Sequence, residues 1–94
     1  MRVRWLRVAL ANLNAEAKYI ARDNPAAAAR VVRAIELAVE LLPGHPAMGR
    51  AGRVPGTREL IVPDTPYIIP YRVCRSAVEI LRVFDAARKW PPKF

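Results

Sequence analysis

Three short apolar runs between residues 56 and 90 most constrain what this chain can fold into. They are rich in β-branched and aromatic side chains, and they cover residues 58–62, 67–73 and 78–84. Runs of this length and composition predict β-strands, and the turn residues at 63–66 and 75–77 predict that consecutive strands are antiparallel. We therefore expect a three-stranded antiparallel unit in this part of the chain.

Two details of these runs lead to more specific expectations. Pro70 lies inside the second run and cannot donate a backbone hydrogen bond, so we predict a bulge or a broken bond beside it. The alternation of the last run predicts one face with Val78, Ile80 and Phe84 and another with Leu81 and Val83. Because helices can cover only one face, we expect the other to be open and to carry apolar residues and arginines.

The first half of the chain predicts one strand followed by two helices. Residues 2–5 alternate charged and apolar side chains, which is typical of a strand with one buried face. Over residues 6–22 the apolar side chains recur at three- and four-residue steps, the pattern of an amphipathic helix. Asn24 and Pro25 then predict the start of a second helix over residues 25–42, packed against the first as an antiparallel hairpin.

These elements together predict an α+β fold. An N-terminal strand, a helical hairpin and a three-stranded antiparallel run would form one small sheet in the order β-α-α-β-β-β. Residues 45–56 contain three glycines and two prolines and are predicted to be a loop. Because 94 residues with 53% hydrophobic content allow one modest core, residues 1–94 are predicted to form a single domain.

The charge of the chain indicates an anionic partner. Sixteen lysines and arginines against eight acidic residues give a formal net charge of +8, which favours binding to nucleic acid or to an acidic protein. No apolar run approaches the ~20 residues that a membrane span requires, so we expect a soluble, cytoplasmic protein.

The residue types that hold metals and cofactors are scarce. Cys74 is the only cysteine, which excludes an intramolecular disulfide, and its apolar neighbours predict a buried, inert thiol. The chain has no glycine-rich phosphate loop, no metal-ligand cluster and no Ser-His-Asp set. The sequence therefore predicts neither a metal nor a cofactor.

Short segments spread over nearly the whole chain form an ordered series. They are Trp5, Tyr19-Ile20-Ala21, Asn24-Pro25, GRAGR at 49–53, GTREL at 56–60, PYII at 66–69, YRV at 71–73, ILRV at 80–83 and RKWP at 88–91. Taken together, they resemble the RelE/ParE superfamily, the toxins of type II toxin-antitoxin modules of bacterial chromosomes and plasmids.

The resemblance implies a small toxin that a cognate acidic antitoxin, ParD-like or similar, neutralises by direct contact. Operator DNA would then be bound only through the toxin-antitoxin complex. RelE-like members cut messenger RNA on the ribosome, whereas ParE-like members poison DNA gyrase. The ParE-like branch, with gyrase as the target, is favoured here. A RelE-like ribosome-dependent endoribonuclease is the alternative, and a degenerate member that only binds an antitoxin or DNA is a third possibility.

The scarcity of acid-base groups favours the ParE-like branch. Cleaving RNA through its 2′-hydroxyl requires a proton acceptor and a proton donor near positive charge. His45 is the sole histidine and lies in the predicted loop, and Asp85 stands where many RelE-like relatives have histidine. No catalytic residue is therefore assigned, and a nuclease would have to use Arg72, Arg82, Asp85 and His45.

Arginines supply most of the predicted partner-binding residues. Those within strands face either a partner on the open sheet or solvent, and Asp85 is expected to hold the tail through an arginine. Trp90 either locks the tail by burial or is an exposed contact. The predicted partner-binding residues are Arg50, Arg53, Arg58, Arg72, Arg82, Arg88 and Trp90.

Overall fold

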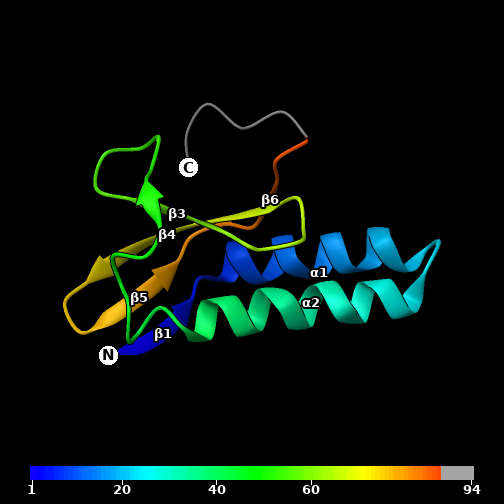
Figure 1. The fold of residues 1–94 in the computed structure, drawn as a ribbon, viewed down its shortest axis with the longest axis horizontal. Helices are drawn as coiled ribbons and strands as arrows, with labels where there is room; N and C mark the ends of the chain where they lie inside the picture. Colours follow the sequence, from blue (N-terminus) through cyan, green and yellow to red (C-terminus); the bar gives the residue numbers. More distant parts are fainter. Residues whose placement is uncertain (88–94) are drawn as a thin grey trace.

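Two helices lie on one side of a mixed sheet in the computed structural model, which describes residues 1–87 (Figure 1). β1 (Arg2–Trp5) leads into α1 (Arg7–Ala21) and α2 (Pro25–Glu40). The remaining strands are β2 (Arg50–Ala51), β3 (Arg58–Ile61), β4 (Tyr67–Cys74), β5 (Ala77–Ile80) and β6 (Phe84–Asp85). The predicted α+β class is confirmed, and the sheet has more strands than the sequence predicted.

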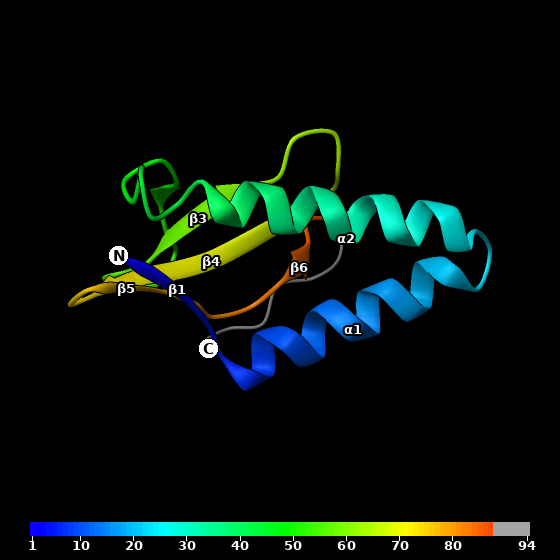
Figure 2. The same ribbon diagram turned by 90° about the horizontal axis from the view of Figure 1, so that it is seen from below.

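Local sequence explains where the helices begin. The Asn24 side chain accepts a hydrogen bond of 3.0 Å from the N–H of Ala27, and Pro25 occupies the first helical position of α2, as predicted. Leu6 precedes α1 without a side-chain cap. The helices run antiparallel, and their connecting loop extends beyond the sheet (Figures 1 and 2).

The sheet has the order β1-β5-β4-β3-β2, with β6 beside β4. The N-terminal strand pairs in parallel with β5, while the other neighbours are antiparallel. A two-residue turn joins β4 to β5, and Arg75 in that turn has a φ of 56°, as such tight hairpins require. Segments from the start and from the last quarter of the chain therefore lie side by side in one sheet.

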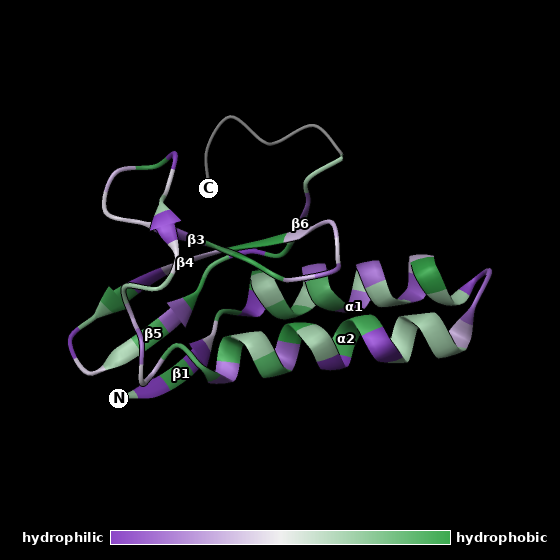
Figure 3. Cartoon of the chain, viewed as in Figure 1, coloured by the Kyte–Doolittle hydropathy of each residue, from purple (hydrophilic) through white to green (hydrophobic). Residues whose placement is uncertain are grey.

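The core lies between the helical hairpin and one face of the sheet. Figure 3 shows apolar and polar bands alternating along both helices, as expected for helices with one buried stripe. The buried apolar residues of the core are Ala9, Leu13, Ile35, Ala38, Val39, Leu42, Leu60, Val62, Tyr67, Ile69, Tyr71, Val78, Ile80 and Val83. Burial of each large aliphatic side chain contributes about 1.5–3 kcal/mol, so this layer holds the hairpin to the sheet.

The predicted disruption at Pro70 is present on one side of β4 only. Towards β3 the register continues through the pair Glu59 and Pro70. The Pro70 carbonyl accepts a bond of 2.9 Å from Leu81 N–H. Because the backbone N and C=O of one strand residue face the same neighbour in an antiparallel pair, the Pro70 nitrogen, which carries no hydrogen, faces the side of β5 and β6. There Ile69 and Pro70 lie opposite three residues, 81–83, which form a bulge between β5 and β6.

The bulge makes the predicted faces of the last run wrong for Val83 and Phe84. A single extra residue moves the following side chains to the opposite face. Val83 therefore packs in the core with Val78 and Ile80, and Phe84 lies opposite Ile68 on the other face. The run 78–84 is accordingly two strands rather than one.

Two further predictions are corrected. The loop over residues 45–56 contains the short strand β2, because its backbone pairs with the first half of β3. Cys74 is exposed rather than buried, because it is the last residue of β4 beside the hairpin turn. Over residues 1–87, no helix combines the length and the apolar character needed to cross a membrane.

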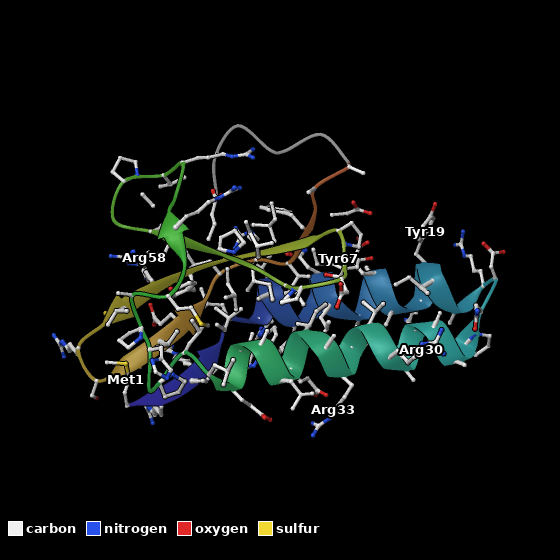
Figure 4. The ribbon with its side chains drawn as sticks, in the orientation of Figure 1. Met1, Tyr19, Arg30, Arg33, Arg58 and Tyr67 are labelled. Atoms are coloured by element: carbon white, nitrogen blue, oxygen red, sulfur yellow. The ribbon has the colours of Figure 1, made fainter. Side chains whose placement is uncertain are left out.

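Polar residues of α1 compensate for the interruption of the sheet. The bulge leaves the Val83 N–H without a strand partner, and it donates instead to Asn12 Oδ1 at 3.2 Å. One turn further along the helix, Glu16 Oε1 accepts a bond of 3.0 Å from the Tyr67 hydroxyl, which lies over α1 (Figure 4). Buried donors need acceptors, and α1 supplies the acceptors for the Val83 N–H and the Tyr67 hydroxyl. These two hydrogen bonds attach α1 to this end of the sheet.

We predict that Asn12→Ala destabilises the protein because it leaves the part-buried Val83 N–H unpaired. The free energy of unfolding, measured by urea denaturation, should fall by about 1–2 kcal/mol. Asn14→Ala is the matched control, since Asn14 lies on the same helix but is exposed. Equal stability of the two variants would contradict the role of Asn12.

Candidate functional site

A row of charged residues crosses the sheet on the face opposite the core. The register places Arg4 beside Glu79 and Glu79 beside Arg72, so three neighbouring strands contribute one side chain each. Glu79 Oε1 accepts from Arg72 Nε at 2.7 Å, and Oε2 accepts from Arg4 Nη1 at 3.3 Å. The carboxylate of Glu79 is buried, whereas both guanidinium groups remain half exposed or more.

A second buried carboxylate repeats this arrangement near the other edge. Glu59 Oε1 accepts two bonds from Arg50, at 3.1 Å from Nε and 3.0 Å from Nη2. Its Oε2 accepts the backbone N–H of Arg53 at 3.1 Å, and the Arg53 guanidinium lies 3.7 Å away. Glu59 is only 2% exposed, while the side chains of Arg50 and Arg53 are about half exposed.

Each glutamate therefore holds two surface arginines in defined positions. A buried carboxylate is tolerated only when its oxygens are bonded, and no buried side-chain oxygen or nitrogen of residues 1–87 lacks a partner. The hydrogen bond and the charge of Glu79 raise the pKa of Arg72, so this guanidinium stays charged at any physiological pH. The arginines are thus ordered cations rather than freely moving ones.

Arg58 has a structural task that the sequence did not indicate. It donates to the carbonyl oxygen of Gly49 at 2.8 Å, which fixes the loop before β2. The buried Tyr71 hydroxyl accepts from the N–H of Gly49 and donates to the carbonyl of Pro46, both at 2.8 Å. A Cβ on Gly49 would lie 2.6 Å from the Tyr71 ring, so glycine is required at this close approach.

Arg72 and Arg82 meet at a pocket of about 420 Å³. Its walls are the loop 54–57 and the side chains of Leu6 and Leu81. Arg82 Nη1 also donates to the carbonyl of Leu81 at 2.6 Å. The two arginines expected in a nuclease site thus line the same pocket, Arg72 from β4 and Arg82 from the bulge between β5 and β6.

The other predicted site residues lie elsewhere. His45 is exposed in the loop after α2 and lines a different depression, beside Leu41. Asp85 pairs with Tyr67 in β6, and its Oδ1 accepts the N–H of Ala87 at 2.8 Å. Arg88 and Trp90 lie outside the described residues. Across residues 1–87, histidine, cysteine and acidic side chains nowhere gather in a group of three that could hold a metal.

Sequence reasoning missed the residues that order this face. Glu59, Glu79 and Arg4 were not singled out, although Glu79 is a lone carboxylate inside an apolar strand. A buried strand position that carries a carboxylate requires cationic partners on neighbouring strands, and this is the signal that would have identified it. Which arginines those partners are depends on the strand order.

The chain is similar to toxins of type II toxin-antitoxin systems. Residues 3–90 match the family model described as the ParE toxin of the type II toxin-antitoxin system parDE. The chain is 52% identical over 90 residues to the candidate toxin Y4kP of Sinorhizobium fredii, covering 96% of this chain and 93% of that protein. It is 38% identical over 84 residues to the toxin RelE2 of Caulobacter vibrioides, covering 89% and 93%.

A solved structure is also similar. A chain from the chromosomal ParDE toxin-antitoxin system of P. aeruginosa superimposes with a TM-score of 0.81 and 32% sequence identity. The match covers 90% of this chain and 95% of that one. The similarity therefore extends over the helical hairpin and the sheet together.

We predict that Glu79→Gln destabilises the protein, because the neutral amide weakens the buried charge-assisted bonds to Arg4 and Arg72. Urea denaturation should show a loss of about 1–2 kcal/mol in the free energy of unfolding. Glu36→Gln on the exposed side of α2 serves as the control and should change it by less than about 0.5 kcal/mol. An unchanged stability of Glu79→Gln would argue against the cluster.

Proposed function

This chain belongs to the ParE family of type II toxin-antitoxin toxins, and on this premise we propose that it inhibits DNA gyrase and is neutralised by direct binding of its cognate antitoxin. The observation that carries the proposal is the match to the ParE model over residues 3–90. The similar solved structure comes from a ParDE system, which supports an antitoxin partner. Both proposed partners place the action of the protein in the cytoplasm.

The charge of the molecule supports an acidic antitoxin. The formal net charge is +8, and four arginines on the open face are held by buried glutamates while their guanidinium groups reach solvent. Ordered cations bind carboxylates with less loss of side-chain entropy than mobile ones. An antitoxin that is acidic would both neutralise this charge and cover the face.

The surroundings of Arg72 and Arg82 favour gyrase inhibition over RNA cleavage. Among the described residues, the lining of their pocket holds no histidine, carboxylate or tyrosine to accept or donate a proton. The sequence of residues 88–94, RKWPPKF, has two lysines but no histidine, aspartate, glutamate or tyrosine side chain. His45 and Asp85 belong to other parts of the structure. A nuclease would need such groups within hydrogen-bond reach of the reacting atoms.

A second candidate is a ribosome-dependent endoribonuclease. One relative carries the name RelE2, and the pairing of Arg72 with Arg82 would suit a phosphate group. In that case positive charge would have to provide most of the rate enhancement. The two candidates differ in their target, which is DNA gyrase for the first and messenger RNA on the ribosome for the second. A gyrase assay and the mapping of transcript ends distinguish them.

Pure toxin incubated with gyrase, ATP and plasmid DNA should trap cleaved DNA or block supercoiling, because ParE-like inhibition acts on the enzyme itself. Agarose gel electrophoresis of the plasmid measures both effects. Heat-denatured toxin is the control, and adding the antitoxin encoded beside the gene should restore supercoiling. A normal gyrase reaction at excess folded toxin would refute the proposal.

Transcript ends mapped on translating ribosomes test the second candidate. Under the gyrase proposal, expression of the toxin arrests growth without producing cuts at fixed codon positions. Codon-positioned cuts that disappear in Arg72→Ala or Arg82→Ala would instead establish the nuclease. Expression without any growth defect would indicate a member that has lost its activity.

A further inference from the structure

We propose that the side of the helical hairpin that faces away from the sheet binds a second copy of this chain, with α2 of one copy antiparallel to α2 of the other. We call this surface the hairpin face. Figure 2 looks onto it, with α1 and α2 side by side in front of the sheet. The inference concerns self-association and does not rest on the proposed function. The groove of the hairpin face is lined by Ala17, Lys18, Ala21, Ala28, Ala29, Val32, Arg33 and Glu36.

The hairpin face has an apolar groove of about 520 Å³ between the two helices. Four of its eight lining residues are alanines, and Val32 at its centre is only partly buried. Leu37, further along α2, is 47% exposed. Short side chains let a second helix approach closely, so a leucine of that helix can pack into the groove. Small residues alone do not identify the occupant, which the charges of α2 do.

The order of charges along α2 fits a second copy of the same helix. Arg30 and Arg33 are exposed in its middle turns, and Glu36 and Glu40 are exposed in its last turns. Arg33 points away from the sheet (Figure 4). Within residues 1–87, none of these four side chains forms an ion pair. A second α2 that runs in the opposite direction brings its glutamates to these arginines, so the pattern is self-complementary about a two-fold axis.

The spacing of these residues defines the register of the pair. Ala29, Arg33, Glu36 and Glu40 follow one another at steps of three and four residues, so they share one side of α2. With the two-fold axis between residues 34 and 35, Arg33 of each copy lies opposite Glu36 of the other. The same register places Leu37 opposite the partly buried Val32 of the groove. Each contact occurs twice, because a two-fold interface is isologous.

The stability of the helix itself does not explain this order of charges. The C-terminus of a helix carries partial negative charge, which disfavours Glu40 as the last residue of α2, and no basic residue lies in the last turn. Within one helix, an arginine that precedes a glutamate is also the weaker orientation of an ion pair. An antiparallel second copy compensates for both, because the N-terminal half of its α2 brings positive charge to Glu40.

The net charge of +8 is spread unevenly and does not prevent this contact. The arginines that surround Glu59 and Glu79 lie on the other side of the molecule, on the face of the sheet opposite the core. On the hairpin face, Lys18 adds to the two arginines and two glutamates of α2, so three basic and two acidic side chains give a local charge of only +1. Two copies joined there keep both arginine faces accessible.

Sedimentation equilibrium of the purified chain, over concentrations up to its solubility limit, tests the proposal. The wild-type chain should show a monomer–dimer equilibrium. Arg33→Glu should raise the dimer dissociation constant about tenfold or more, because symmetry places the new carboxylate against Glu36 twice. Arg75→Glu is the matched control, since it makes the same change of charge in the β4–β5 turn, and it should leave the constant within about twofold.

Mixing two variants distinguishes a direct contact from an effect on folding. Arg33→Glu leaves only acidic side chains at positions 33 and 36, and Glu36→Arg leaves only basic ones, so each variant alone should be monomeric. An equimolar mixture should form a dimer with one copy of each, because every arginine at these positions then faces a glutamate. Circular dichroism should show that both variants are folded.

Exposed ion pairs and short apolar side chains make the contact weak. The chain is therefore monomeric at the dilute concentrations of urea denaturation, where Glu36→Gln serves as a stability control.

Three results would overturn the proposal. The first is a wild-type chain that stays monomeric at every concentration, which would leave the hairpin face to a different protein. The second is a dimer that Arg33→Glu and Arg75→Glu weaken equally, and the third is a mixture of the two α2 variants that remains monomeric. Gyrase inhibition is measured separately, so none of these results changes the family assignment.

Discussion

β4 lies between β3 and the last two strands, and Pro70 at its centre has no N–H to donate to one of these neighbours. The missing donor faces the last strands, so the bulge at residues 81–83 forms there and the pairing with β3 remains continuous. Two consequences follow from that single missing hydrogen bond. Val83 turns into the core, and its freed N–H binds Asn12, which attaches α1 to the sheet. The bulge at residues 81–83 and the hydrogen bond from Val83 to Asn12 therefore arise together.

The open face depends on a different constraint, the cost of burying a carboxylate. Glu59 and Glu79 are both nearly inaccessible, and each is stable in the sheet only because arginines from neighbouring strands or loops surround it. The two glutamates do not neutralise the positive charge of this face. Two arginines share one glutamate in each cluster, so each keeps a net positive charge and ordered guanidinium groups.

The structure offers two surfaces with different chemistry. The pocket of Arg72 and Arg82 combines two arginines with leucines and a loop containing Pro55 and Gly56. The groove between α2 and the outer edge of β3 is mostly aliphatic and has Arg50 in its lining. Because these surfaces lie on separate parts of the molecule, different substitutions can alter each of them. Arg58, in contrast, is used to hold the loop before β2.

The sequence by itself determined the features that depend on neighbouring residues along the chain. Asn24 and Pro25 defined the start of α2, the apolar periodicity defined both helices, and the position of Pro70 showed where the sheet would be interrupted. The ordered motifs indicated the superfamily to which the ParE family belongs. Only the tertiary structure decided which strand carries the bulge, which arginines surround Glu59 and Glu79, and that Cys74 is exposed. These features depend on strand order and register, which bring residues such as Arg4 and Glu79 together from opposite ends of the chain, and a shift of one residue reverses every face that follows it.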